Sequence, residues 1–269
     1  MCLIVLAYRA HPDFPLIVAA NRDEFLDRPA EPARFWPAEP HVLAGRDHKA
    51  GGTWLGVTTG GRFAALTNYR DLRRPLVQGP SRGSLVRSAL EDGFFPVGTE
   101  VYDGLNLLYG TVDELMYHNN ITGETLPLVP GIYGLSNHLL NTPWPKVERA
   151  KRGMEQILGG ASDMVEQLFQ LLGDGTTASD ELLPDTGLEM DRERALSSIH
   201  ISLPNYGTRC STVVLFSNEG SISFDERVSE PATRSSYSFD VGQRNKTEGF
   251  GVELAGRTTT NGIPGHKGQ

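Results

Sequence analysis

The chain has 269 residues, 39% of them hydrophobic and 22% charged, so it is long enough to bury a sizeable core. Its formal net charge of −8 argues against a general nucleic-acid-binding role, which needs a basic surface. Two cysteines cannot form a disulfide framework, and no apolar stretch approaches the roughly 18 residues of a membrane-spanning helix. We therefore expect a cytoplasmic protein without a nucleic-acid partner or a transmembrane segment.

The first third of the chain is predicted to be rich in strands. Residues 2–8 and 16–23 are apolar runs on either side of a His-Pro-Asp turn signal, which indicates a hairpin. Four prolines between residues 28 and 41 favour a loop there. Residues 53–71 are predicted to form a second hairpin that turns at a Thr-Gly-Gly sequence.

Helices and strands are predicted to alternate in the middle of the chain. Apolar residues recur at helical spacing in 81–93, and strands are expected within 106–128. Two further helices are predicted at 145–158 and 163–172. Strands in two groups with helices between them indicate two packed sheets with helices outside.

The last third is predicted to contain one long hairpin between irregular segments. Residues 173–190 are polar and turn-rich, which favours a loop or a mobile insertion. The hairpin is expected at 208–228, turning at Asn-Glu-Gly. We expect a single domain over residues 1–254 and a disordered tail at 255–269.

Several common sites are not expected. The histidines lack H-x-H and H-E-x-x-H spacing and neither cysteine has a C-x-x-C partner, so no metal site is predicted. The glycine pairs complete no dinucleotide-binding or P-loop motif, and no G-x-S-x-G sequence is present. The chemistry must therefore come from another arrangement of residues.

Polar residues at the end of the second apolar run point to Cys2. If 2–8 and 16–23 pair as an antiparallel hairpin, Arg22 or Asp23 lies near Cys2. A guanidinium there would favour the thiolate, and it would lower the pKa of the Cys2 α-amine if Met1 is removed. The alternative interpretation is a solvated charge cluster in a turn.

Three other polar residues have the same position at a predicted strand boundary: Asn68, Asn137 and Arg209. An asparagine can donate to an oxyanion, and an arginine can orient a nucleophile or hold a carboxylate. The alternative is that they are turn-forming asparagines and a surface arginine. Trp54 is predicted to lie in the core or at the rim of a pocket, and Cys210 to be a packed apolar residue.

Six sequence motifs resemble the NRDE family, which contains the transport and Golgi organisation protein 2 homologues. The match runs in order from residue 1 to about residue 230. The motifs are MCLIVLAY, ANRDE, GGTWLGV, LTNYR, YGLSNHLLNTPWPK and YGTRCSTV.

The resemblance implies both a fold and a site. The NRDE family is similar to N-terminal nucleophile hydrolases of the choloylglycine hydrolase and penicillin V acylase kind, whose fold is an αββα sandwich. The expected class is therefore α+β, with two antiparallel sheets between helices. By this resemblance Cys2 would be the nucleophile and its own amine the base. The other expected roles are orientation by Arg22 and Asp23, oxyanion donation by Asn137 and more weakly Asn68, a distal arginine at Arg209, and substrate contacts at Asn21 and Trp54.

One departure from the hydrolase pattern affects Asp23. In the hydrolases the aspartate follows the arginine by several residues, whereas here it follows immediately. Because a strand turns successive side chains to opposite faces, this spacing favours Arg22 over Asp23 as the residue that faces Cys2.

Two functions remain open at this point. The first is a cysteine-dependent amide or acyl hydrolase, or an acyltransferase, acting on a small amphipathic substrate without a cofactor. The second, implied by what is known of the NRDE family, is a binding or trafficking protein for haem or an acyl lipid, linked to Golgi organisation and secretion. A purely structural role has no positive support in the sequence.

We expect Met1 to be removed, because a small residue follows it. The intact mass of the purified protein should then be lower by one methionine. A mass that retains Met1 would take away the α-amine of Cys2, and with it the expected base, and would favour the binding function.

Overall fold

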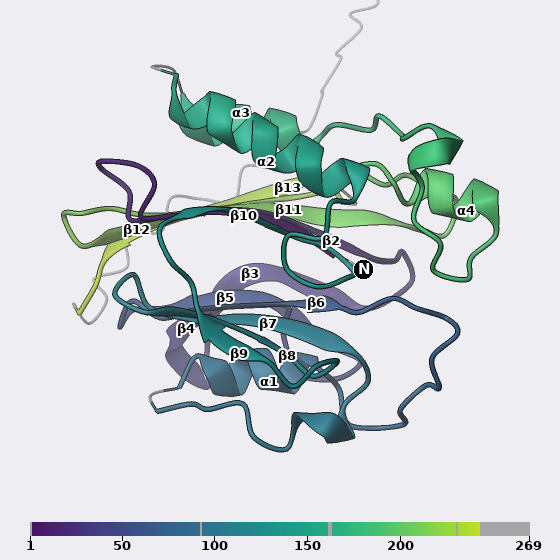
Figure 1. The fold of residues 1–269 in the computed structure, drawn as a ribbon. Helices are drawn as coiled ribbons and strands as arrows, with labels where there is room; N and C mark the ends of the chain where they lie inside the picture. Colours follow the sequence, from purple (N-terminus) through teal and green to yellow (C-terminus); the bar gives the residue numbers. More distant parts are fainter. Residues whose placement is uncertain (1, 92, 161–162, 230, 243–269) are drawn as a thin grey trace, which may run out of the picture.

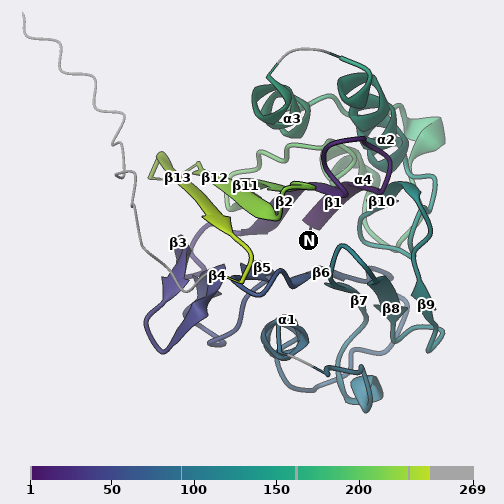
Figure 2. The ribbon, with the colours of Figure 1, turned by 90° about the vertical axis from the view of Figure 1, so that its left-hand side faces the viewer.

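Two antiparallel sheets packed face to face form the centre of the protein, with helices outside both (Figures 1 and 2). The computed structural model describes residues 2–91, 93–160, 163–229 and 231–242. The two-sheet αββα architecture predicted from the sequence is confirmed. The tail predicted at 255–269 lies outside the described residues.

The first sheet, sheet A, has six strands in the order β10-β1-β2-β11-β12-β13. Its two central hairpins are the ones predicted at 2–8/16–23 and 208–228. The outer strands β10 and β13 were not anticipated as strands of this sheet. The bounds are β1 Cys2–Tyr8, β2 Leu16–Phe25, β10 Gly131–Leu135, β11 Tyr206–Phe216, β12 Ser221–Val228 and β13 Thr233–Asp240.

The second sheet, sheet B, has seven strands in sequence order from β3 to β9. The hairpin predicted at 53–71 is its β5–β6 pair, and the strands predicted within 106–128 are β7, β8 and β9. The bounds are β3 Ala30–Trp36, β4 Glu39–Asp47, β5 Leu55–Thr58, β6 Phe63–Asn68, β7 Leu105–Gly110, β8 Leu115–Asn119 and β9 Thr125–Pro127.

Helices cover the outer face of each sheet (Figure 2). α2 and α3 lie on sheet A at the predicted positions, and α1 lies on sheet B. The α-helix bounds are α1 Gly83–Ala89, α2 Pro145–Leu158, α3 Met164–Leu172 and α4 Met190–Ala195, with short 3-10 turns at Thr99–Val101 and Asp180–Leu182. No helix of the described ranges is long and apolar enough to cross a membrane.

Alternation along β1 and β2 sends one set of side chains between the sheets and the other set under the helices. Ile4 and Val18 belong to the core between the sheets, whereas Leu3, Val5 and Ile17 pack beneath α2 and α3. Strands that are apolar on both faces are what buried sheets require. This alternation decides which polar residues at the strand ends can meet.

The loop predicted from the prolines of 28–41 is wrong, because most of this segment forms β3 and the start of β4. β3 is the edge strand of sheet B, and its register against β4 shifts between Glu31 and Arg34, around Pro32. Proline is tolerated at edges and bulges because it has no N–H to donate. Prolines here mark a sheet edge rather than a loop.

Residues 173–190 are not a simple loop, because they contain a 3-10 turn and lead directly into α4. Thr186 is buried, and its backbone N–H donates to the Glu193 carboxylate at 3.1 Å. The segment is therefore tied to α4.

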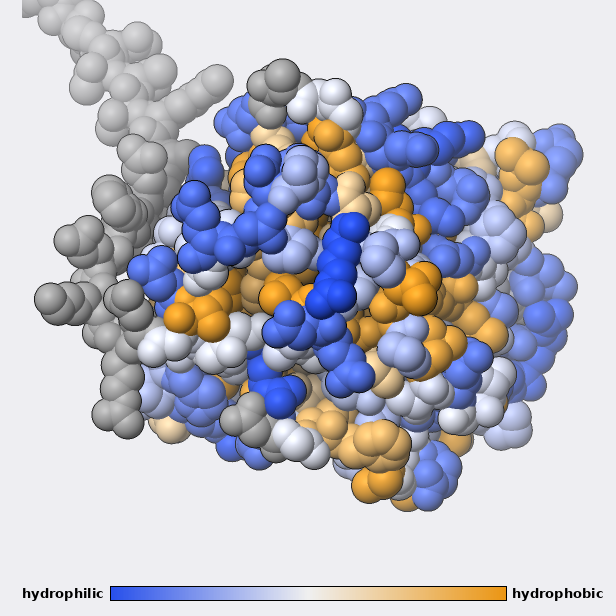
Figure 3. All heavy atoms as spheres, turned by 60° about the vertical axis from the view of Figure 1, so that its left-hand side comes forward, coloured by the Kyte–Doolittle hydropathy of each residue, from blue (hydrophilic) through white to orange (hydrophobic). Residues whose placement is uncertain are grey.

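On the molecular face in Figure 3, apolar residues form separate patches among charged and polar ones.

Replacing Gly52 with alanine should destabilise the fold. A Cβ at Gly52 would lie 2.5 Å from the backbone carbonyl carbon of Gly83 at the start of α1, so the backbone must shift. Overpacking of this kind costs about 1–3 kcal/mol. Gly175→Ala is a matched control, because its Cβ would meet nothing within 4 Å. Urea unfolding should show a lower stability for Gly52→Ala only; equal stability of the two variants would contradict this contact.

Candidate active site

Cys2 begins a strand in the middle of sheet A, opposite Arg22. The hairpin argument predicted Arg22 or Asp23 near Cys2, and in the register of β1 with β2 the residue opposite Cys2 is Arg22. Directly paired residues point to the same face of a sheet, and so does the pair two residues further along each strand. That pair, Ile4 and Ala20, belongs to the core between the sheets. The Cys2 and Arg22 side chains therefore point toward sheet B.

Burial dominates the electrostatics of the Cys2 thiol and raises its pKa above the ordinary value. The negative charge of Asp23 acts in the same direction. The backbone N–H of Asp23, which donates to the sulfur, and the positive charge of Arg22 act in the opposite direction. The thiol therefore needs a base to become a nucleophile at neutral pH.

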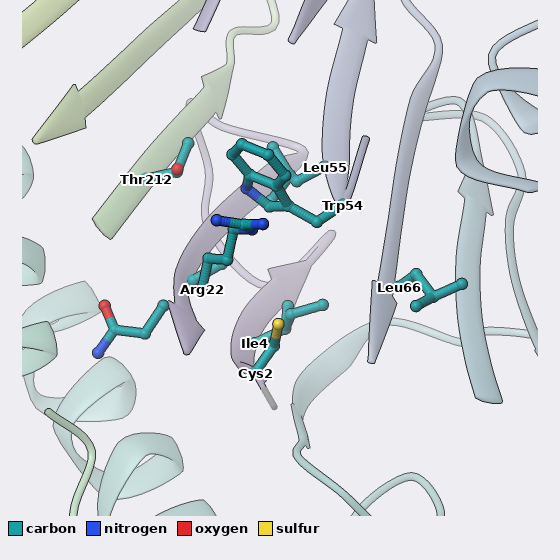
Figure 4. Close-up of a pocket in the computed structure, with 9 residues that line it drawn as sticks. Cys2, Ile4, Arg22, Trp54, Leu55, Leu66 and Thr212 are labelled. Carbon is teal, nitrogen blue, oxygen red and sulfur yellow. The ribbon is translucent and has the colours of Figure 1, made fainter. Parts of the chain in front are cut away.

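Arg22 is held in place by an aromatic ring and a carboxylate. Its guanidinium carbon lies 4.1 Å from the centre of the Trp54 ring, and Figure 4 shows the two side chains stacked. Its Nη2 lies 3.5 Å from Oδ2 of Asp47, which also accepts a 2.6 Å hydrogen bond from Nε of Arg28. A cation over a desolvated tryptophan face is a favourable contact, and Arg22 is only 5% exposed.

A small cavity adjoins Cys2 between the sheets, with a volume of about 10 Å³. That is roughly the room needed for one water molecule. Both sheets line this cavity, and Figure 4 shows several of the residues. The lining residues of sheet A are Cys2, Ile4, Ala20, Asn21, Arg22 and Thr212; those of sheet B are Leu55 and Leu66, together with Trp54, which directly precedes β5.

Asp23 points away from this cavity, as the spacing argument favours. It pairs with Thr208 of β11, whose hydroxyl donates to its carboxylate at 2.7 Å, and its backbone carbonyl accepts from the Tyr206 hydroxyl at 3.0 Å. Burial raises the pKa of Asp23, while the positive charge of Lys146 lowers it. Asp23 acts on Cys2 through its backbone N–H and its charge.

Lys146 was not anticipated and is the most unusual charge near the site. It lies in the first turn of α2 and is 1% exposed, and its Nζ has no hydrogen-bond partner among the described residues. Burial lowers its pKa to about 8, opposed by the charges of Asp23 and Cys2. The periodicity of α2 contained a signal, because Lys146 precedes the buried Ala150 and Met154 at four-residue spacing.

Asn137 and Asn68 are brought to the same side of the site as Cys2. Asn137 is fully buried, and its Nδ2 donates to the Asn68 backbone carbonyl at 3.0 Å. The neighbouring Ser136 hydroxyl donates to the backbone carbonyl of Cys2 at 3.2 Å. Among the described residues, the Asn68 carbonyl is the one acceptor of the Asn137 amide, and Asn68 enters this arrangement through that carbonyl. Their catalytic roles stay predictions.

Arg209 is placed at a bulge of β11, between Thr208 and Cys210. Its Nη1 donates to three backbone carbonyls at and after the end of β2, those of Phe25, Leu26 and Arg28, at 2.9 to 3.0 Å. This contact ties the chain after β2 to β11. The role of distal arginine in catalysis stays a prediction.

Asn21 lies on the helix-facing side of β2. Its Nδ2 donates to the backbone carbonyls of Leu172 and Ile199, both at 2.9 Å, and its Oδ1 accepts from the Ser211 hydroxyl at 2.6 Å. Its side-chain donors thus hold sheet A to the end of α3 and to the segment after α4. The predicted substrate contact stays untested, as does that of Trp54. Cys210 is buried, as predicted.

Two solved structures resemble this chain at low sequence identity. An N-acylethanolamine-hydrolysing acid amidase orthologue from Caenorhabditis elegans is 11% identical with a TM-score of 0.43, covering 80% of this chain and 92% of its own. A conjugated bile acid hydrolase from Clostridium perfringens is 10% identical with a TM-score of 0.45, covering 99% and 100%.

The sequence relatives are much closer. The Transport and Golgi organization protein 2 homologues of Bos taurus and Homo sapiens are 36% and 34% identical, each over 84% of this chain and 92% of the relative. The Drosophila melanogaster protein of the same name is 28% identical over similar lengths. Residues 1–231 match the family described as Transport and Golgi organisation 2, and the chain belongs to that family.

Proposed function

We propose that this protein is a cysteine-dependent hydrolase or acyltransferase that acts on the amide or acyl bond of a small amphipathic substrate. The observation that carries the proposal is the register that sets Cys2 opposite Arg22, with both side chains directed into a cavity between the sheets. A thiol at a strand end, beside a fixed guanidinium, is an arrangement suited to nucleophilic catalysis.

The proposed reaction starts once Met1 has been removed. The α-amine of Cys2 takes the thiol proton, and the thiolate adds to the substrate carbonyl. The tetrahedral intermediate expels the amine, which leaves with the proton, and a thioester remains on Cys2. Water then cleaves the thioester in hydrolysis, or a second nucleophile takes the acyl group in transfer.

The surrounding charges assist the first step. A positive charge near an amine or a thiol lowers its pKa, because the charge disfavours the ammonium form and favours the thiolate. Arg22 supplies such a charge from between the sheets, and Lys146 supplies another from the helix side. Asn137 is the proposed oxyanion donor, through the Nδ2 hydrogen that Asn68 does not take.

A second candidate is binding without turnover, of an acyl lipid or haem, in the transport or Golgi organisation that the relatives' names describe. It is favoured by the raised pKa of the Cys2 thiol, because a protonated thiol is a poor nucleophile. In that case Cys2 would serve as the buried end of β1.

Cys2→Ala should abolish hydrolysis. Removal of a catalytic nucleophile costs more than about a thousandfold in kcat. The measurement is release of amine from a panel of short- and medium-chain acyl coumarin amides by the Met1-free protein. Cys2→Ser keeps the side-chain shape and controls for packing, with thermal unfolding as the check on the fold. Hydrolysis that survives in Cys2→Ala would exclude Cys2 as nucleophile; no hydrolysis by the wild type would favour the second candidate.

Lys146→Met should move the pH dependence of Cys2 reactivity to higher pH. Lys146 carries its charge below its pKa of about 8, which is the range in which an α-amine titrates, so loss of this charge raises the pKa of the Cys2 amine that acts as the base. The measurement is the rate of iodoacetamide alkylation at Cys2, located by peptide mapping. Lys151→Met is the control, because Lys151 lies on the same helix in an ion pair with Glu148 at 3.7 Å.

The same variants give an independent stability measurement. The pKa of Lys146 is about 8 in the folded protein, against 10.5 ordinarily, so the unfolded chain binds more protons between these values. The wild-type free energy of unfolding should therefore contain a component that rises with pH from about 8 to 10.5. This component should be missing in Lys146→Met and present in Lys151→Met. Superimposable pH profiles of wild type and Lys146→Met would show that Lys146 is not the charge described here.

A further inference from the structure

A second and larger cavity lies beside the one at Cys2, with a volume of about 300 Å³. Arg22 and Trp54 line both cavities. The stacked pair is therefore a shared wall, with Cys2 on one side and the larger cavity on the other. We call the larger cavity the outer pocket; the residues lining it are Arg22, Ala30, Glu31, Pro32, Trp54, Arg209, Cys210, Glu226, Val228, Pro231 and Thr233.

The outer pocket has the size and composition of a small-molecule site. Sites for small ligands usually have volumes of about 300–1,000 Å³, apolar walls and a few convergent polar groups. Its apolar lining comes from Trp54, Pro32, Val228 and Pro231. A volume at the lower limit of that range favours a compact ligand over a long acyl chain.

Glu226 is the polar group that most needs a ligand. It is 1% exposed, and its carboxylate accepts hydrogen bonds from the Ala33 N–H at 2.6 Å, the Thr212 hydroxyl at 3.3 Å and the Cys210 thiol. All of these donors are neutral. Burial raises the pKa of Glu226, while its hydrogen-bond donors and the positive charge of Arg22 act in the opposite direction. No ion pair joins Glu226 to a cation of the described residues.

The other charged groups of the outer pocket already have partners. Arg22 lies against Asp47 and Trp54, and Nη1 of Arg209 donates to three backbone carbonyls. Glu31 pairs with Arg34 and His48. A second polar atom without a partner among the described residues is the buried hydroxyl oxygen of Thr233.

The Trp54 ring packs directly against the backbone of Gly45, which has no side chain. A Cβ at Gly45 would lie 2.3 Å from the Trp54 ring, so the ring occupies the space that any other residue at position 45 would fill. The shared wall is thus held between Gly45 and Arg22, without a hydrogen bond from the ring to either residue.

We propose that the outer pocket binds the part of the substrate remote from the scissile bond, and that this part is a compact apolar group carrying an ammonium or similar cationic N–H donor. The cation would supply the counter-ion of Glu226 and donate to Thr233, while the scissile carbonyl reaches Cys2 past the shared wall. This inference rests on the proposed function, because it assigns the substrate of the same site.

The test uses alkylation of Cys2, which requires access to the thiol but no turnover. Three chloroacetamides of equal length would carry a dimethylammonium, an isopropyl or a carboxylate group, of which the first keeps one cationic N–H. Each is compared with iodoacetamide on the full-length, Met1-free protein, with labelling measured at Cys2 by peptide mapping. We expect the cationic reagent to react about tenfold faster than the anionic one, because like charges are disfavoured at a buried carboxylate.

Glu226→Gln should remove the preference for the cationic reagent and leave iodoacetamide labelling unchanged. Glu219→Gln is the matched control, because Glu219 is exposed at the turn of the same β11–β12 hairpin. Val228→Phe, which fills the outer pocket, should slow all three tailed reagents by about tenfold and spare iodoacetamide. The two variants test charge and space separately.

Equal rates for the three reagents in the wild type, or rates insensitive to Glu226→Gln and Val228→Phe in folded protein, would overturn the inference. This failure differs from failure of the proposed function. A protein that shows the charge preference but hydrolyses no amide would retain the outer pocket as a binding site and lose the hydrolase.

Discussion

The pairing of β1 with β2 is the constraint on which the site depends. In this register Cys2 faces Arg22, and the next pair, Leu3 and Asn21, faces the helices. A slip by one residue would turn every side chain of β1 to the other face of the sheet, placing Cys2 beneath the helices and Leu3 between the sheets. Both faces of β1 are apolar, so the register depends on how closely each set of side chains fits its own core: Ile4 and Leu6 between the sheets, Leu3 and Val5 beneath the helices. The same packing that stabilises sheet A therefore also orients the thiol.

Buried charged side chains lie on both sides of this strand pair, and they differ in whether an oppositely charged side chain lies next to them. Arg70 and Glu193 form a buried ion pair at 2.8 Å, whereas Lys146 has no hydrogen-bond partner among the described residues and Glu226 accepts from neutral groups only. Isolated buried charges are costly, and they are retained where a function uses them. Neither Lys146 nor Glu226 forms an ion pair within the described ranges, and they lie on either side of the Cys2–Arg22 pair: Lys146 toward the helices, Glu226 toward the outer pocket.

Local pattern was enough to predict much of the fold and the centre of the site. The hairpins, the helices at 145–158 and 163–172, and the Cys2–Arg22 neighbourhood follow from runs of apolar residues and turn signals, which act over a few residues. The prolines near Pro32 misled because their meaning depends on whether a strand lies at a sheet edge, which only the assembled sheet decides. Lys146 and Glu226 escaped notice because their surroundings come partly from distant segments, Asp23 near Lys146 and Ala33 at Glu226.

The absence of a side chain at Gly45 has a consequence for how the binding preferences of this fold can diverge. Gly45 lies on β4 of sheet B, and the Trp54 ring fills the place of its missing Cβ. A single methyl group at this position would displace the ring toward Arg22 and so move the shared wall that separates the two cavities. Relatives could therefore acquire a different ligand range through one exchange behind the tryptophan, with every polar group of the thiol site preserved.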